Sequence, residues 1–250
     1  MKKNGLNPPR VSCHDCRLRA MPCFSPFSAS ELAFMESFKA GELRVDRDTP
    51  IVLEGTSSPH LYTVLEGTAI RFKTLEDGRR QVIGFVLPGD FIGLQAAVMA
   101  EMQHSVTAVT AMHLCVFNRA DLYRMFGEQP ERSFDVTWLA AREEHFLGDQ
   151  LMTVGRRSAL ERVAHALHML HGRALDVGIA TKTSMDMPFT QEDLADALGL
   201  SLVHTNKTLS RLRALQVASW KTKKLEIFDR ERLADIAGIE NAPPPIRPLI

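Results

Sequence analysis

The stretch PFTQEDLADALGLSLVHTNKTLSRLRALQVASW, which runs from Pro188 to Trp220, constrains the fold of this chain more than any other. Thr190 is a good N-cap for a short helix, and Gly199 permits the left-handed conformation that ends it. Ser201 can then cap a second helix. Two helices joined by a glycine-containing turn, with polar side chains on the first turns of the second helix, form the geometry that enters a major groove.

The second helix is expected to have an inward apolar side, formed by Leu202, Thr205, Leu209, Leu212 and Leu215. The sequence SWKTKKLEIFD follows, alternates around a basic turn and predicts the hairpin of a winged helix. From 201 to 224 the chain holds six basic residues and no Asp or Glu, which favours a polyanionic partner. A plain helical hairpin with a solvated basic face is the alternative. The DNA contacts that this pattern predicts are Ser201, Val203, His204, Asn206, Lys207, Ser210, Arg211, Lys221, Lys223 and Lys224.

Residues 42–118 have the pattern of a β domain. Turn signals recur at Gly55, Gly67, Asp77-Gly78 and Pro88-Gly89-Asp90, between short apolar runs such as LYTVLEG and QVIGFVL. This spacing predicts a compact antiparallel barrel or roll.

A helix is expected from about Ser133 to Val154, where apolar and small residues recur at steps of four and three. The seam consists of Phe134, Trp138, Ala141, His145, Gly148 and Met152. Such a seam either packs on its own barrel or pairs with a second copy, and its length favours self-association. The next helical run carries His165, His168 and His171 at every third position, which we interpret as a solvated helix edge rather than a metal face.

Composition excludes several classes. No run of about 18 apolar residues occurs, and the opening MKKNGLNPPR lacks the apolar stretch of a signal peptide, so we expect a cytoplasmic protein without a membrane span. The sequence contains no H-E-x-x-H, Walker loop or G-x-S-x-G motif, and C-H-D-C does not follow a βαβ pattern. We therefore expect no enzyme activity. The net charge is zero, but 156–232 carry 13 basic against 9 acidic residues.

The order of these parts resembles the Crp/Fnr family of bacterial transcription regulators. The motifs LYTVLEGTAIRF, DGRRQVIGFVLPGDFIGL and TQEDLADALGLS carry the resemblance, which spans 13–237. It implies an α+β fold with an N-terminal antiparallel β-roll like a cyclic-nucleotide-binding domain, a long dimerisation helix and a C-terminal winged helix-turn-helix. It also implies a homodimer that binds partly palindromic duplex DNA and contacts RNA polymerase. The expected domains are a cysteine-bearing arm (1–29), the roll (30–130), the dimerisation helix (131–155), the winged helix (156–235) and a Pro-rich, irregular tail (236–250).

The roll lacks residue pairs that would bind a cyclic nucleotide, and this restricts the signals that it can sense. Members similar to the cyclic AMP receptor protein carry a Gly-Glu pair after the GDxxG turn and an Arg-Ser pair further on. Here the segments are GDFIGLQAAVM and QHSVTAV. A buried cyclic phosphate without a cation leaves an unpaired charge that costs several kcal/mol. No cyclic nucleotide is therefore expected in the usual mode.

The cysteines indicate a different signal. Cys13, Cys16 and Cys23 form C-x2-C-x6-C, and Cys115 lies about ninety residues further on. Clustered cysteines in a cytosolic protein suggest a metal, a cluster or redox chemistry, and four thiolates are what an iron–sulfur cluster needs. The family's oxygen sensor, the fumarate and nitrate reduction regulator, holds an oxygen-labile cluster in this way, so the resemblance implies a [4Fe-4S] cluster on these four residues. Two alternatives remain: a thiol or disulfide switch, or a buried Cys115 without function beside a zinc-binding or adventitious C-x2-C.

Overall fold

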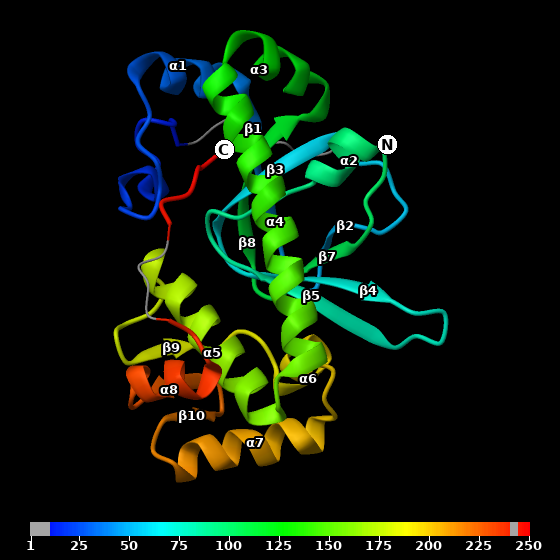
Figure 1. Ribbon diagram of the computed structural model, residues 1–250. Helices are drawn as coiled ribbons and strands as arrows, with labels where there is room; N and C mark the ends of the chain where they lie inside the picture. Colours follow the sequence, from blue (N-terminus) through cyan, green and yellow to red (C-terminus); the bar gives the residue numbers. More distant parts are fainter. Residues whose placement is uncertain (1–10, 241–244) are drawn as a thin grey trace. The chain divides into compact units, whose positions relative to one another are not determined.

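The computed structural model describes residues 11–240 and 245–250, which form two compact units (Figure 1). The first unit contains the described residues of 11–71, 86–144 and 245–250. The second contains 72–85 and 145–240. None of the described helices is long and apolar enough to cross a membrane.

The first unit is built on a β-roll, as the turn spacing predicts. Two four-stranded sheets have the orders β1-β8-β3-β6 and β2-β7-β4-β5. The pairs β1/β8, β3/β8, β3/β6 and β2/β7 are antiparallel. The strands are β1 (Lys39–Val45), β2 (Pro50–Val52), β3 (His60–Glu66), β4 (Ala69–Thr74), β5 (Arg80–Val86), β6 (Phe91–Ile92), β7 (Ser105–Ala108) and β8 (Met112–Asn118).

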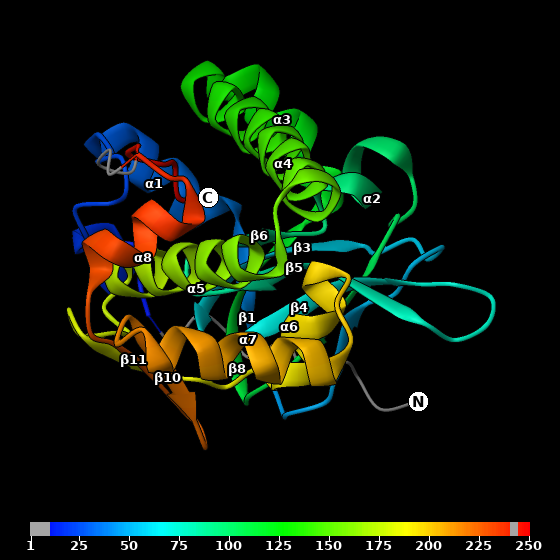
Figure 2. The same cartoon turned by 60° about the horizontal axis from the view of Figure 1, so that its bottom comes forward.

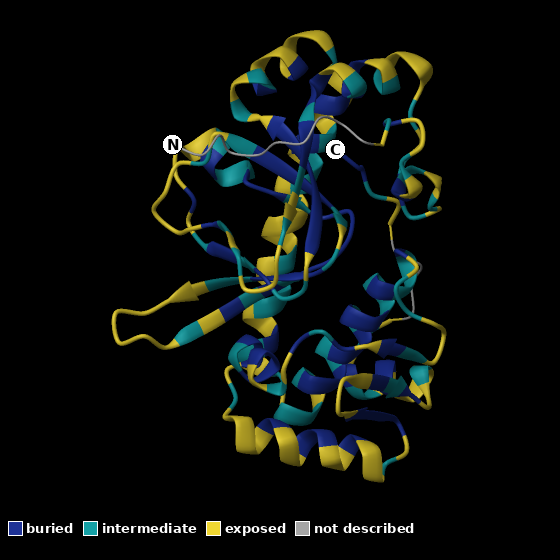
Figure 3. Ribbon diagram, turned by 180° about the vertical axis from the view of Figure 1, so that it is seen from behind, coloured by how far each residue is buried: buried dark blue, intermediate teal, exposed yellow. Residues whose placement is uncertain are grey.

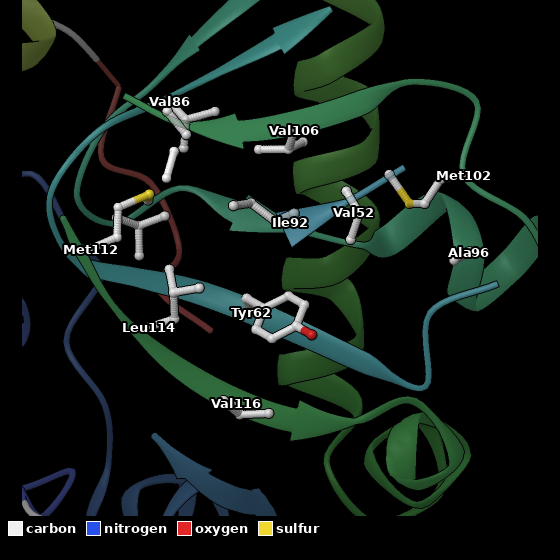
Figure 4. Close-up of a cluster of buried hydrophobic side chains, with 13 residues drawn as sticks. Val52, Tyr62, Val86, Ile92, Ala96, Met102, Val106, Met112, Leu114 and Val116 are labelled. Carbon is white, nitrogen blue, oxygen red and sulfur yellow. The ribbon is translucent and has the colours of Figure 1, made fainter. Parts of the chain in front are cut away.

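Strand β8 is buried on both faces, and this positions the candidate site. Met112, Leu114 and Val116 point into the apolar core of the roll, which Figure 4 shows. Because successive side chains of a strand alternate between faces, the residues between them point to the opposite side. There Cys115 and Phe117 belong to a second buried cluster. The cysteine therefore faces away from the interior of the roll.

The helices of the first unit flank the sheets. They are the short 3-10 helices η1 (Arg17–Ala20) and η2 (Arg119–Asp121), with α1 (Ala29–Phe38), α2 (Leu94–Met99) and α3 (Leu122–Glu128). Helix α4 (Pro130–Arg156) begins in the first unit and continues from residue 145 in the second. Helix α4 is the helix expected over 133–154, and it extends a few residues beyond both ends of that range. Its start at Pro130 agrees with the preference of proline for the first helical turn.

Besides 72–85 and the end of α4, the second unit consists of a winged helix. It contains α5 (Ala159–Asp176), β9 (Ser184–Asp186), α6 (Gln191–Leu198), α7 (Leu202–Ala214), β10 (Ala218–Lys221), β11 (Lys224–Ile227) and α8 (Arg230–Ala237), with a sheet of order β10-β11-β9 (Figure 2). The predicted caps are confirmed: the Thr190 hydroxyl accepts from the Asp193 amide, and Gly199 ends α6 at φ +62°. The Ser201 hydroxyl accepts from the His204 amide and caps α7.

Two expectations about side chains in this unit are wrong. Leu202 was expected to face inward but is 43 % exposed, because it is the first residue of α7 and lies beyond the packed side of the helix. The histidines of α5 do not form a solvated edge: His168 is buried, His171 is fully buried and His165 is partly covered. Arg230 donates to Nδ1 of His171, and Nε2 of that ring lies 3.0 Å from the Thr181 carbonyl, so the ring is a neutral structural group.

Candidate functional site

Three of the four cysteines line one pocket of the first unit. Cys13 and Cys16 come from the N-terminal arm and Cys115 from the middle of β8, and their side chains border a cavity of about 200 Å³. Cys13 and Cys115 are buried, and Cys16 is partly buried. Residues about a hundred positions apart in the sequence are therefore brought together, as the cysteine hypothesis requires.

A buried ion-pair network holds the arm beside Cys115. Glu42, the strand partner of Cys115 in β1, is 1 % exposed and accepts from Nζ of Lys39 at 2.7 Å. Its second oxygen lies 2.7 Å from Nε2 of His113. Val11 closes the network, since its amide donates to Glu42 and its carbonyl accepts from Lys39 at 2.7 Å. A carboxylate and an ammonium that are both buried must be paired, and here the pairing also fixes the start of the arm.

The ionisation of this site follows from its burial. Burial raises the pKa of Cys13 to about 11 and that of Cys115 to about 12. Burial also acts to raise the pKa of Glu42, but the hydrogen bond from Lys39 and the further bonds outweigh it and lower that pKa to about 2. In the metal-free protein the two buried cysteines are thus protonated thiols around a fixed carboxylate. A bound metal would hold them as thiolates and release their protons.

The donor set fits a thiolate-bound cluster in its chemistry. Arg19 and Lys39 line the pocket, and their positive charge would favour an anionic group bound there. Cys23 does not line the pocket, although it lies on the same arm and its carbonyl accepts from the Arg247 amide at 2.9 Å. Among the described residues no three His, Cys, Asp or Glu side chains stand in a metal-binding arrangement. Four-fold ligation therefore requires the arm to bring Cys23 towards the pocket.

The second candidate surface is the outer face of α7. All the residues predicted to contact DNA on this helix are exposed, whereas Thr205, Leu209 and Leu212 are buried and Leu215 is partly buried (Figure 3). Thr208 is also buried, and its hydroxyl donates to the His204 carbonyl at 2.8 Å. The outward residues are Ser201, Val203, His204, Asn206, Lys207, Ser210 and Arg211.

The wing extends this face with three exposed lysines. Strands β10 and β11 pair in register from Ala218 opposite Ile227 to Lys221 opposite Lys224. A two-residue turn joins them, and its first residue, Thr222, has φ +54°. Lys221, Lys223 and Lys224 surround this turn and are exposed. Helix α7 and the wing together form a basic surface without an acidic residue between 201 and 224.

The seam expected on α4 is largely exposed in the single chain. Phe134 is 68 % and Met152 48 % exposed, and Trp138 is partly buried. Ala141, His145 and Gly148 are exposed, with His145 3.5 Å from Asp149. The seam therefore does not pack inside its own subunit along most of its length. Leu147 and Leu151, which the seam omitted, add to the exposed apolar surface of this helix.

A β-roll, a long helix and a winged helix in this order define a DNA-binding regulator with a sensory domain. Residues 42–129 match the family model of the cyclic nucleotide-binding domain, and 161–236 match that of the Crp-like helix-turn-helix domain. The chain belongs to the Crp/Fnr family of transcription regulators.

Individual relatives agree with this assignment. The chain is 34 % identical over 206 residues to the nitrogen fixation regulation protein FixK of Bradyrhizobium diazoefficiens, a match that covers 80 % of this chain and 83 % of the relative. It is 28 % identical over 238 residues to the transcriptional activator protein FnrL of Cereibacter sphaeroides, covering 90 % and 92 %. The solved structure of FixK2 from Bradyrhizobium japonicum superposes with a TM-score of 0.72 at 26 % identity, covering 81 % of this chain and 98 % of that one.

The sequence did not reveal the buried polar residues beside the cysteine pocket. Lys39, Glu42 and His113 have no motif, and each is an ordinary surface residue type in sequence. One signal was available: Glu42 and His113 lie within 42–118, the region with the pattern of a β domain, so both were candidates for a buried pair.

Proposed function

We propose that this regulator senses oxygen or redox state through an iron–sulfur cluster held by Cys13, Cys16, Cys23 and Cys115, and that the cluster controls DNA binding. The observation that carries the proposal is the convergence of three of these thiols on one pocket. A cluster bound there would supply chemistry that oxygen destroys. The resemblance to the family's oxygen sensor, the fumarate and nitrate reduction regulator, favours the [4Fe-4S] type.

The protein's own residues have two tasks in this proposal. Lys39 and Glu42 hold the arm at Val11, so that Cys13 stays beside Cys115. Arg19 and Lys39 offset the negative charge of thiolates at the pocket. The first task is carried by hydrogen bonds that do not depend on the cluster being present.

We further propose that the protein binds duplex DNA as a homodimer, with RNA polymerase as a further partner. The exposed seam of α4 is the surface that a second copy covers, and α7 and the wing contact two half-sites about one helical turn apart. Asn206 and Lys207 are assigned to bases, as partners of adenine and guanine, and Val203 to a thymine methyl. Arg211 and the three wing lysines are assigned to phosphates.

We do not assign cyclic nucleotide binding to the roll. Its described inner core consists of apolar side chains, among them Tyr62, Met102 and Met112 (Figure 4). Arg71, a cation of the roll, is paired with Glu143 and donates to the Phe91 carbonyl. A cyclic phosphate in this core would meet no free cation on the described side chains that form it.

A thiol or disulfide switch is the second candidate, because Cys13 and Cys115 belong to the same buried cluster. The burial of both thiols counts against it, since oxidation of a cysteine requires access to the oxidant.

Anaerobic purification followed by an absorption spectrum and by iron and sulfide assays tests the cluster. Wild-type protein and the exposed-neighbour control His14→Ala are expected to hold about four iron atoms per chain. Cys23→Ser and Cys115→Ser are expected to lose the iron. Iron-free anaerobic protein with full DNA affinity overturns the proposal, and a change of affinity on oxidation of that iron-free protein supports the thiol switch instead.

A further inference from the structure

Segment 245–250 packs against the cysteine arm. It follows the winged helix in the chain, yet it belongs to the first unit. The Arg247 amide donates to the Cys23 carbonyl and the Arg247 carbonyl accepts from the Ser25 amide, each at 2.9 Å. These bonds form a short parallel bridge around Phe24. Of the Pro-rich tail predicted over 236–250, residues 236 and 237 belong to α8 and 241–244 lie outside the described residues. Residues 245–250 are irregular and docked through specific backbone bonds.

The Arg247 side chain anchors the segment to the roll. Its guanidinium donates to Oδ1 of Asp90 at 2.9 Å and to the Pro88 carbonyl at 3.2 Å, and it lies over the Phe24 ring at 4.7 Å. Gly89 makes this approach feasible: its φ is +84°, and a Cβ there would stand 2.3 Å from Phe24. Charge-assisted hydrogen bonds to a nearly buried carboxylate are the strong kind, so this is a specific docking contact.

The end of the segment forms a wall of the cysteine pocket. Leu249 and Ile250 are 2 % and 3 % exposed and line the pocket. Ile250 belongs to the same apolar cluster as Cys13 and Cys115. The hydroxyl of Thr63 donates to the Ile250 carbonyl. Thr63 is the strand partner of Cys115 in β3, so the bond is made directly beside the cysteine.

We propose that segment 245–250 is a lid on the cysteine pocket, latched by Arg247 on Asp90, that shields Cys13 and Cys115 from solvent and oxidants. This deepens the proposed function, because the lid covers the proposed cluster site. The segment follows α8 in the chain but belongs with the arm to the first unit.

Thiol reactivity in reduced, metal-free, full-length protein tests the lid without involving the cluster. Ellman's reagent is added to wild type, Arg247→Ala and the control Ile246→Ala, whose side chain is 62 % exposed in the same segment. Mass spectrometry assigns the modified residue. Arg247→Ala is expected to speed modification of Cys13 and Cys115 by about 10-fold or more, since it removes charge-assisted bonds that hold the closed state. Ile246→Ala should match wild type. Equal rates for all three proteins overturn the proposal.

A peptide added in trans separates a lost lid from general loosening. The peptide NAPPPIRPLI, which corresponds to 241–250, should restore slow modification to the Arg247→Ala protein, whereas the same peptide with alanine in place of its arginine should not. If the first peptide gives no protection, the faster reaction came from loosening of the fold and the lid is rejected. Because no iron is present, a failed cluster proposal leaves both results valid.

Discussion

The cysteine pocket differs in construction from the DNA-reading face, by which we mean the exposed side of α7 together with the wing lysines. Segments from the arm, β1, β3, β8 and 245–250 meet at the pocket. The polar groups that hold these segments together, those of Lys39, Glu42, His113 and Thr63, are buried and hydrogen-bonded. The reading face comes from the single stretch 201–224, and its polar side chains point to solvent. Paired, buried groups determine whether the site holds its shape, whereas exposed groups remain available to a ligand. Substitutions at the pocket should therefore act through stability, and those at the reading face through binding.

The largest expected effect is the loss of Glu42. Glu42→Ala leaves Lys39 charged and buried without its partner, so the free energy of unfolding should fall by about 3–5 kcal/mol. Urea denaturation measures this. The matched control is Glu226→Ala, which removes an exposed pair with Lys224 and should cost less than about 1 kcal/mol. Equal effects of the two substitutions would remove the distinction between the two regions.

The next effect concerns association, where an exposed apolar residue should alter assembly but not folding. Phe134→Glu places a charge on the seam of α4, and since Phe134 is 68 % exposed the single chain loses little packing. Sedimentation should show a shift to monomer, and DNA affinity should fall by about 100-fold or more because one half-site contributes little. Tyr123→Glu is the control, on an aromatic residue of α3 that is 89 % exposed. A dimer that survives Phe134→Glu would contradict the assignment of this seam.

The DNA-binding unit also contains a buried polar residue, His168, which should affect stability and not binding. Burial lowers the pKa of His168 to about 4, and its Nδ1 has no hydrogen-bond partner among the described residues. The unfolded chain, with a pKa near 6.5, binds more protons between these values. The stability from neutral His168 is therefore complete above pH 6.5 and is lost as the pH falls below it.

The expected loss from His168 is about 2 kcal/mol between pH 7 and pH 5. Thermal unfolding over this range measures it. His168→Gln should reduce the pH dependence without removing it, because burial also lowers the pKa of His165 to about 4 and lowers that of His171. His145→Gln, at an exposed position on α4, is the control. An unchanged slope in His168→Gln would assign the acid sensitivity to other groups.

The smallest effects are expected for substitutions on the DNA-reading face, which should not change the free energy of unfolding. Lys207→Ala is expected to relax preference at one base pair by about 1–3 kcal/mol. Lys223→Ala should weaken binding to every sequence and lower the salt slope by about one. Binding-site selection and salt titration measure the two effects. An equal loss on all sequences for Lys207→Ala would show that this lysine contacts only the backbone.

The same contrast explains what could be predicted from the sequence. The caps Thr190, Gly199 and Ser201 and the exposed side of α7 were predictable because helix signals and periodicity are local. The turn spacing predicted the roll for the same reason. The four cysteines were recognisable as a set, but their neighbours were not.

Long-range packing decided the rest. Lys39, Glu42 and His113 became a buried network only through strand register, which no local pattern specifies. Segment 245–250 carries the prolines of an irregular tail, and only the fold places Arg247 on Asp90. The histidines of α5 were misjudged because the position of α8, which brings Arg230 to His171, was not predictable from α5 alone.

In the proposed function, the cysteine site controls DNA binding by the winged helix. DNA affinity and iron content should be measured on one anaerobic preparation before and after exposure to air. We expect iron and DNA affinity to be lost together, and we expect Cys115→Ser to have low DNA affinity before any exposure to air. Affinity that stays constant while the iron is lost would contradict it.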